Sequence, residues 1–188
     1  YSIIGALESW SICSEHEEWI SRPMQNYEAY KQFYKTLYKV FDPIKFDPNQ
    51  WAEAAKNAGM KYVIPTTKHH DGFCMFDSNQ TDFKITSPDC PFSKNPKADI
   101  LLHVLEAFRQ QDFMAGVYFS KPDWNCEHFW WPYYATPDRH VNYDPAKHPE
   151  KWQQFKDFTF NQIQELMTGY GHVDILWLDG AWVRPLEN

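Results

Sequence analysis

Short apolar segments alternate with longer amphipathic segments along most of this chain, and this alternation limits the folds open to it. Segments of β-prone residues lie at 61–65, 113–119 and 173–178. Segments with apolar residues at helical spacing lie at 48–58, 100–108 and 149–168. Strands that alternate with helices usually pair in parallel, so the pattern predicts the α/β class. A doubly wound sheet and a (β/α)8 barrel both satisfy it, and both place chemistry at the carboxyl ends of the strands.

The first two helices begin at residues suited to helix starts. Asp47 can accept hydrogen bonds from the free N–H groups of a first turn, and Pro48 suits the first helical position. Helical spacing then relates Trp51, Ala54, Ala55 and Ala58, before a stop at Gly59. The second helix begins near Asp99, and its apolar face consists of Ile100, Leu101, Val104, Leu105 and Phe108.

The absence of a phosphate-binding motif separates the two architectures. No glycine-rich phosphate loop follows a predicted strand, which disfavours a nucleotide-binding sheet. A complete barrel usually needs about 250 residues. The chain has 188. We therefore predict an α/β fold of the TIM-like (β/α)8 barrel type that is incomplete in this chain.

Composition narrows the class of ligand. The net charge is −7 and there is no basic run, so nucleic acid is not an expected partner. No window approaches the roughly 20 apolar residues of a membrane span, so none is predicted. Aromatic residues make up 18% of the chain, and their faces suit the C–H faces of sugar rings. Several of these rings lie in a long loop, residues 121–147. Loops of this length inside a compact domain are often functional, so we expect a functional role for it.

Asp179 is the sharpest candidate for chemistry because it closes the third strand and is followed by Gly180. Trp177 lies two residues earlier, so the alternation of a strand places its indole on the same face as the carboxylate. An aspartate at this point can equally cap the next helix. Tyr118, within the second strand, can reach the same mouth or pack in the core.

A second polar cluster, His69-His70-Asp71, follows the first strand. Neutral imidazoles donate and accept hydrogen bonds to sugar hydroxyls. Neighbouring residues of an extended segment point apart, so both histidines are not expected to bind one metal. A metal site would need Asp71 as a further ligand, and it stays an alternative. Near the start of the chain, Glu18 and Trp19 pair a carboxylate with an indole.

Several blocks of sequence, in order, resemble the α-L-fucosidases of glycoside hydrolase family 29. The most specific is Lys-His-His-Asp-Gly-Phe at 68–73, followed by Phe-Asp-Ser at 76–78. The strand that ends in Trp-Leu-Asp-Gly at 177–180 is similar to the family's nucleophile strand. The remaining blocks lie at 46–52, 58–62, 116–120, 123–124 and 170–171. The matches cover roughly residues 16 to 182.

The resemblance implies a (β/α)8-like barrel and a retaining exo-glycosidase that releases terminal α-L-fucose without a cofactor or metal. By position, Asp179 would be the nucleophile and Trp177 would line its subsite. His69 and His70 would hydrogen-bond the hydroxyls of fucose. The resemblance further implies sugar contacts by Glu18 and Tyr118 and a pocket wall formed by Trp19.

Departures from the family pattern indicate a partial domain. A His-Trp-Gly segment, the acid/base carboxylate and a C-terminal β-sandwich are expected before Tyr1 or beyond Asn188. Within the chain, Pro65 stands where the family more often has an aliphatic residue, and Phe119 replaces a frequent Tyr or His. We therefore expect residues 1–188 to be part of a glycosidase catalytic barrel, with little activity alone.

The implied partner is a fucosylated oligosaccharide or glycoconjugate. Members of the family are commonly lysosomal, secreted or periplasmic, and this sequence does not choose among these compartments. Linkage preference and oligomeric state stay open, with a homo-oligomer as one alternative. Two other functions remain: a fucose-binding relative without catalysis, and a metal-dependent barrel hydrolase that uses His69, His70 and Asp71.

Overall fold

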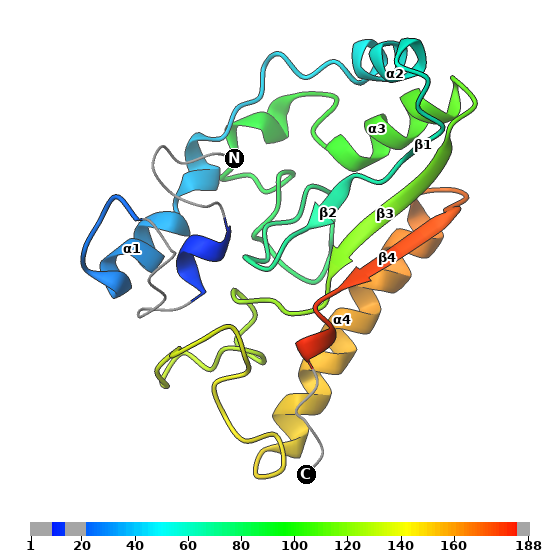
Figure 1. Ribbon diagram of the computed structural model, residues 1–188. Helices are drawn as coiled ribbons and strands as arrows, with labels where there is room; N and C mark the ends of the chain where they lie inside the picture. The colour runs from blue at the N-terminus through cyan, green and yellow to red at the C-terminus, as the bar shows by residue number, and fades with distance from the viewer. Residues whose placement is uncertain (1–8, 14–21, 184–188) are drawn as a thin grey trace.

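A parallel sheet of four strands organises the part of the chain that the computed structural model describes, residues 9–13 and 22–183 (Figure 1). Strand β3 (Met114–Ser120) pairs with β4 (Ile175–Asp179) along one edge. Strands β1 (Tyr62–Val63) and β2 (Thr66–Lys68) follow the other edge. Every pairing is parallel, which confirms the predicted α/β class.

Strands β1 and β2 are two parts of one interrupted strand. Tyr62 is opposite Met114 and Thr66 is opposite Tyr118, so the register is the same on both sides of the break. Pro65 lies in the break and has no N–H for the ladder, although its carbonyl accepts from the Tyr118 N–H at 3.0 Å. The prediction of a strand over 61–65 was therefore wrong at its end, because pairing resumes and continues to Lys68.

The three predicted helices are present, and their caps explain where they begin. Helix α2 (Pro48–Asn57) is capped by Asp47, whose carboxylate accepts from two backbone N–H groups. Helix α3 (Ile100–Arg109) is capped in the same way by Asp99. Helix α4 (Pro149–Gly169) has proline in its first turn. The buried residues of α2 are Pro48, Ala52 and Ala55, whereas Trp51 is half exposed.

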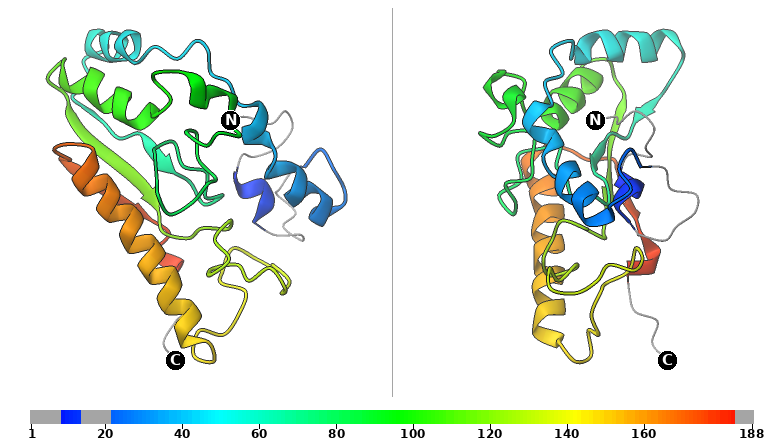
Figure 2. Two further views of the ribbon diagram at one scale, coloured as in Figure 1. Left: turned by 180° about the vertical axis from the view of Figure 1, so that it is seen from behind. Right: turned by 90° about the vertical axis from the view of Figure 1, so that its left-hand side faces the viewer.

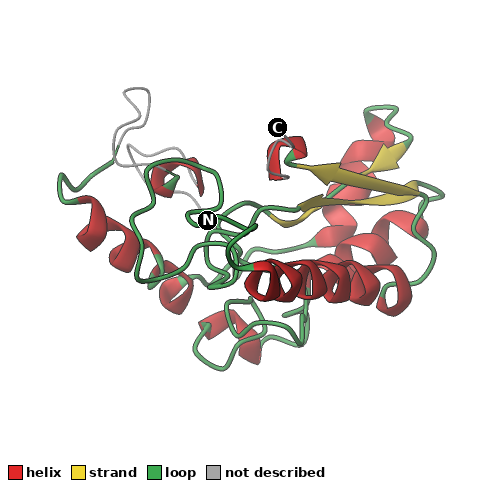
Figure 3. Ribbon diagram, turned by 90° about the horizontal axis from the view of Figure 1, so that it is seen from below, coloured by secondary structure: helices red, strands yellow, loops and turns green. Residues whose placement is uncertain are grey.

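Helices α3 and α4 pack on one face of the sheet, and Figure 3 shows the long α4 beside the strands. The side chains that join them form one buried cluster, which includes Leu101, Leu105, Ala115, Val117, Phe119 and Leu166. Strand alternation directs Tyr118 of β3 and Trp177 of β4 to the opposite face. The two side chains singled out on these strands therefore point away from this helix-covered core.

Helix α1 (Tyr27–Tyr34) and the long loop 121–147 lie beyond the carboxyl ends of the strands (Figures 1 and 2). The sequence prediction missed α1, which begins at an Asn26 cap and buries its tyrosines. One buried cluster joins it to the loop through Tyr30, Tyr34, Trp124, Phe129 and Trp130. Single 3-10 turns lie at Ser9–Ile12, Leu37–Val40, Pro91–Lys94 and Ala181–Val183.

None of the helices in the described ranges combines the length and the apolar character that crossing a bilayer requires.

Candidate active site

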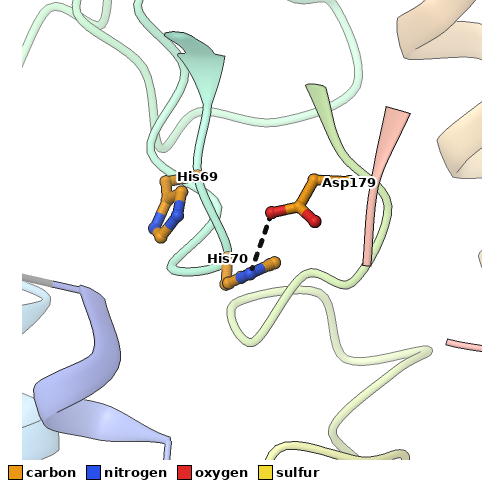
Figure 4. Close-up of side chains that lie close together, drawn as sticks. All are labelled: His69, His70 and Asp179. Carbon is orange, nitrogen blue, oxygen red and sulfur yellow. Dashed lines mark ion pairs between the residues drawn. The ribbon is translucent and has the colours of Figure 1, made fainter. Parts of the chain in front are cut away.

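Asp179 is the last residue of β4, and its carboxylate is held by two short hydrogen bonds. The Tyr118 hydroxyl donates to Oδ2 at 2.5 Å, and the Gly180 N–H donates to Oδ1 at 2.6 Å. His70 Nε2 lies 3.7 Å from Oδ2, and Figure 4 marks this pair with a dashed line. The side chain of Asp179 remains 43% exposed. The carboxylate is thus fixed in orientation while one side stays open to a ligand.

The hydrogen bonds decide the charge of Asp179. Partial burial raises the pKa of the carboxyl group, but the hydrogen bonds from Tyr118 and Gly180 and the nearby His70 outweigh burial. The pKa of Asp179 therefore lies below its ordinary value. The group is an anion at neutral pH.

Tyr118 connects the carboxylate to the aromatic part of the site. Its ring lies 6.2 Å from the Trp177 ring and stacks on His69 with centroids 5.9 Å apart. Its hydroxyl also lies 2.9 Å from Ser120 Oγ. Trp177 is 56% exposed and shares the open face of the sheet. The alternative in which Tyr118 packs only in the core is excluded by its contact with Asp179.

His69 and His70 lie closer together than expected. The chain leaves β2 after Lys68, so the rule that neighbours point apart fails here and the ring centroids are 4.5 Å apart. His69 Nδ1 is hydrogen-bonded to Ser9 Oγ. His70 is 1% exposed, and its Nδ1 is buried with no hydrogen-bond partner among the described residues.

Aromatic rings surround His70 and keep it neutral. Trp10, Trp124 and Trp182 all have ring centroids between 5.1 and 5.4 Å from the imidazole. Burial, followed by the neighbouring His69, lowers the pKa of His70 to about 3, although Asp179 acts in the opposite direction. A neutral imidazole beside a carboxylate can donate or accept hydrogen bonds to a polyhydroxylated ligand.

The residues that could hold a metal differ from those predicted. In the described ranges, one group of three candidate ligand residues comes together: the ligand atoms of His69, His70 and Asp179 lie within 4.8 Å of one another. Asp71, the third ligand of the metal hypothesis, is not in this group. Its carboxylate accepts a 2.8 Å hydrogen bond from the Tyr34 hydroxyl, and burial raises its pKa.

A buried ion pair lies next to the histidine segment. Lys68 is fully buried, and its ammonium donates to Asp123 Oδ2 and Gln162 Oε1, both at 2.9 Å. Asp123 Oδ1 accepts from two backbone N–H groups at the start of the long loop. The backbone N–H of the next residue, Trp124, donates to the His70 carbonyl at 2.8 Å. This network fastens the long loop to the strand end that bears the histidines.

Gly72 makes the close approach of the loop feasible. Its φ is +84°, and a Cβ there would lie 2.4 Å from Asp123 Oδ1. Any other residue would push the loop away and strain the backbone.

The structure brings together five of the seven predicted site residues: His69, His70, Tyr118, Trp177 and Asp179. Glu18 and Trp19 lie outside the described residues. Sequence reasoning missed Trp10 and Trp182, which form walls around His70. The sequence signal that could have indicated Trp182 is its position two residues after Gly180.

Comparison with known proteins gives the class and the family. Of the solved structures, an α-L-fucosidase GH29 from Bacteroides thetaiotaomicron superposes with a TM-score of 0.69 and 31% identity. The match covers 81% of this chain and 31% of that one. Another solved structure, of an α-L-fucosidase GH29 from Bacteroides thetaiotaomicron, is a trapped covalent intermediate with 2-fluoro-fucosyl fluoride, obtained with a glutamate-to-glutamine mutant. The fold is therefore that of a GH29 TIM-barrel catalytic domain over a partial region.

A Thermotoga maritima α-fucosidase in complex with fucose has a TM-score of 0.60 and 33% identity, over 80% of this chain and 32% of that one. α-L-Fucosidase 1 of Arabidopsis thaliana is 31% identical over 76% of this chain and 24% of its own length. The family model described as Alpha-L-fucosidase matches residues 1–188. The chain belongs to the α-L-fucosidase family, and it spans about a quarter to a third of the length of these relatives.

Proposed function

We propose that the complete protein containing this segment is a retaining exo-α-L-fucosidase in which Asp179 is the nucleophile. One observation carries the proposal: the Asp179 carboxylate is anionic, oriented by Tyr118 and Gly180, and open on one side at the carboxyl end of β4. A nucleophile needs these properties. The covalent intermediate of the Bacteroides relative supports the same chemistry in this family.

In the proposed first step, an Asp179 oxygen attacks the anomeric carbon of the terminal fucose. The bond to the glycosidic oxygen breaks, its electron pair stays on that oxygen, and a second carboxyl group supplies the proton. In the second step that carboxylate takes a proton from water, and the water oxygen attacks the anomeric carbon. The ester bond breaks and restores the Asp179 carboxylate.

The histidines and aromatic rings would bind the sugar. His69 and His70 lie beside the carboxylate and offer hydrogen-bonding nitrogens. Trp177 and Tyr118 offer ring faces next to them. We propose contacts from these four side chains to the hydroxyls and C–H face of fucose. The fucose complex of the Thermotoga relative supports this class of ligand.

The second carboxyl group is proposed to come from outside the described residues. Asp71 is held by Tyr34 and Asp123 by Lys68, so both nearby carboxylates already have structural partners. The short span relative to the relatives supports a catalytic barrel completed by further chain. For the same reason we propose that residues 1–188 alone have little activity.

The direct test is hydrolysis of an aryl α-L-fucoside by the complete protein, followed by proton NMR during the first turnovers. Two successive displacements retain configuration, so α-L-fucose should form first and the β anomer should appear only by mutarotation. First formation of the β anomer would contradict the covalent scheme. Binding of fucose without any turnover would instead support a non-catalytic relative.

Tyr118→Phe should change how this activity depends on pH. The substitution removes a hydrogen bond that lowers the pKa of Asp179, so that pKa should rise. Because the nucleophile must be ionised, kcat/KM is lost as the pH falls through this pKa, and the acidic limb should move to higher pH. We also expect kcat/KM at neutral pH to fall about 10-fold, the scale of one hydrogen bond to a charged group.

The matched control is Ser120→Ala. Ser120 contacts the same tyrosine hydroxyl, but the Tyr118–Asp179 bond stays in place. The pH profiles of the wild type and this control should coincide. An unmoved acidic limb in Tyr118→Phe would count against a role for Tyr118 in keeping Asp179 ionised.

A further inference from the structure

A second cavity, separate from Asp179, lies between α1 and the long loop. It has a volume of about 440 Å³, within the usual range of small-molecule sites. We call it the loop pocket. The residues that matter to its chemistry are Gln32, Lys35, Asn125, Trp130, Tyr133 and Tyr134.

Aromatic rings form much of its surface. Trp124 and Trp130 also line it, and they stack at 5.4 Å with an angle of 16° between their planes. Both are buried, so they give a fixed wall. Tyr133 and Tyr134 are exposed, by 86% and 48%, and leave their rings available to a ligand. Exposed rings over a rigid aromatic wall suit the C–H face of a sugar.

Lys35 supplies a polar group with no partner. Its ammonium has neither an ion pair nor a hydrogen bond among the described residues, although it lines the pocket. Burial, and then the neighbouring Lys31, lower its pKa. Gln32 and Asn125 add amide donors and acceptors. A ligand with several hydroxyls would satisfy these groups.

The charges around the pocket favour a neutral ligand. Lys31 is already paired with Glu28 at 2.9 Å and also donates to Thr136. The lining also contains the ammonium of Lys35 and the carboxylate of Glu127. Positive and negative side chains therefore balance. A phosphate, sulfate or carboxylate would meet no excess of positive charge.

Trp124 links this pocket to the candidate active site. Trp124 lines the loop pocket and its ring lies 5.1 Å from the His70 ring, while its backbone N–H donates to the His70 carbonyl. Trp124 thus borders the loop pocket and is also a neighbour of His70 in the candidate active site. We propose that the loop pocket binds neutral sugar units of the glycan to which the terminal fucose is attached. This inference rests on the proposed fucosidase activity.

The test compares two substrates and one ligand, using the complete protein. The substrates are an aryl α-L-fucoside, which lacks further sugars, and a fucosylated N-acetyllactosamine. The ligand is N-acetyllactosamine itself, with its Kd measured by calorimetry. Lys35→Met and Tyr133→Ala each remove part of the pocket lining, the half-buried ammonium of Lys35 and the exposed ring of Tyr133. Lys56→Met and Phe160→Ala make the same type of change, at a lysine and at an aromatic residue, in exposed side chains of α2 and α4 and serve as controls.

Each pocket variant should lower kcat/KM for the trisaccharide, fucosylated N-acetyllactosamine, by about 10-fold. It should also raise the Kd of the disaccharide, N-acetyllactosamine, by about 10-fold. Hydrolysis of the aryl fucoside should change by less than about twofold, because this substrate lacks the further sugars. The controls should match the wild type. If the wild type hydrolyses both substrates and the pocket variants leave trisaccharide hydrolysis and disaccharide binding unchanged, the loop pocket assignment is overturned. If the wild type hydrolyses neither substrate, the proposed fucosidase function fails, whatever the disaccharide does.

Discussion

Asp179→Gly in the complete protein should lower the release of fucose from an aryl α-L-fucoside by at least about 1,000-fold, the scale seen when covalent enzymes lose a catalytic group. The substitution removes the anion that would attack the anomeric carbon. It also leaves the Tyr118 hydroxyl its contact with Ser120, so the strand end keeps a hydrogen bond. The measurement is steady-state release of the aryl group.

Azide separates a lost nucleophile from a damaged fold. In Asp179→Gly the small anion can enter the space of the carboxylate, attack the anomeric carbon and displace the aryl oxide. We expect partial recovery of aryl release, with a β-L-fucosyl azide as the product. Asp82→Gly, at an exposed aspartate away from the strand ends, should behave as the wild type. Near-normal activity of Asp179→Gly without azide would remove Asp179 from the mechanism.

The elements of the fold were predictable where local signals were strong. Asp47-Pro48 and Asp99 mark helix starts because their carboxylates cap nearby N–H groups, and the structure has these bonds. Helix α1 was missed because its buried residues are tyrosines, which a hydrophobicity pattern reads as intermediate. The strand's continuation over Thr66–Lys68 was missed because it depends on pairing with β3, which a local pattern that stops at Pro65 does not contain.

The sequence indicated which residues form the candidate site better than it indicated how those residues are arranged. Position at a strand end, with Trp177 two residues earlier, made Asp179 a candidate, and the resemblance to the fucosidases favoured it as the nucleophile. The bond between Tyr118 and Asp179 joins residues 61 positions apart, and it depends on the register between β3 and β4. No local pattern contains that register. The close approach of His69 and His70 likewise follows from where β2 ends, which the sequence misplaced.

The buried ion pair beneath the histidines was the largest omission. In the sequence, Lys68 is one charged residue of the 68–73 block and Asp123 lies near the start of the long loop, so neither residue indicates the other as its partner. Their meeting crosses 55 positions. Because burying two charges is costly, such a pair needs good geometry and further hydrogen bonds. Gln162 and two backbone N–H groups provide these bonds here.

Lys68→Met should lower the free energy of unfolding by about 3–5 kcal/mol, because it leaves the Asp123 carboxylate buried without its cation. Methionine fills similar space and can contact the Phe119 ring, so a cavity is not the main cause. Lys68→Met/Asp123→Asn removes both charges while an amide oxygen can still accept from the loop N–H groups. This double variant should therefore be more stable than Lys68→Met alone, by at least about 1 kcal/mol.

Urea unfolding of the complete protein, followed by tryptophan fluorescence, measures both effects. Lys56→Met is the matched control, because that lysine is exposed and, within the described part of the chain, its ammonium donates one hydrogen bond, to Gln111. The stability of this control should lie within about 0.5 kcal/mol of the wild type. A double variant as unstable as the sum of its single variants would show that the two charges do not depend on each other. If the pair does fasten the long loop to the histidine strand, Lys68→Met should also reduce kcat for the aryl fucoside, and the double variant should recover part of that loss.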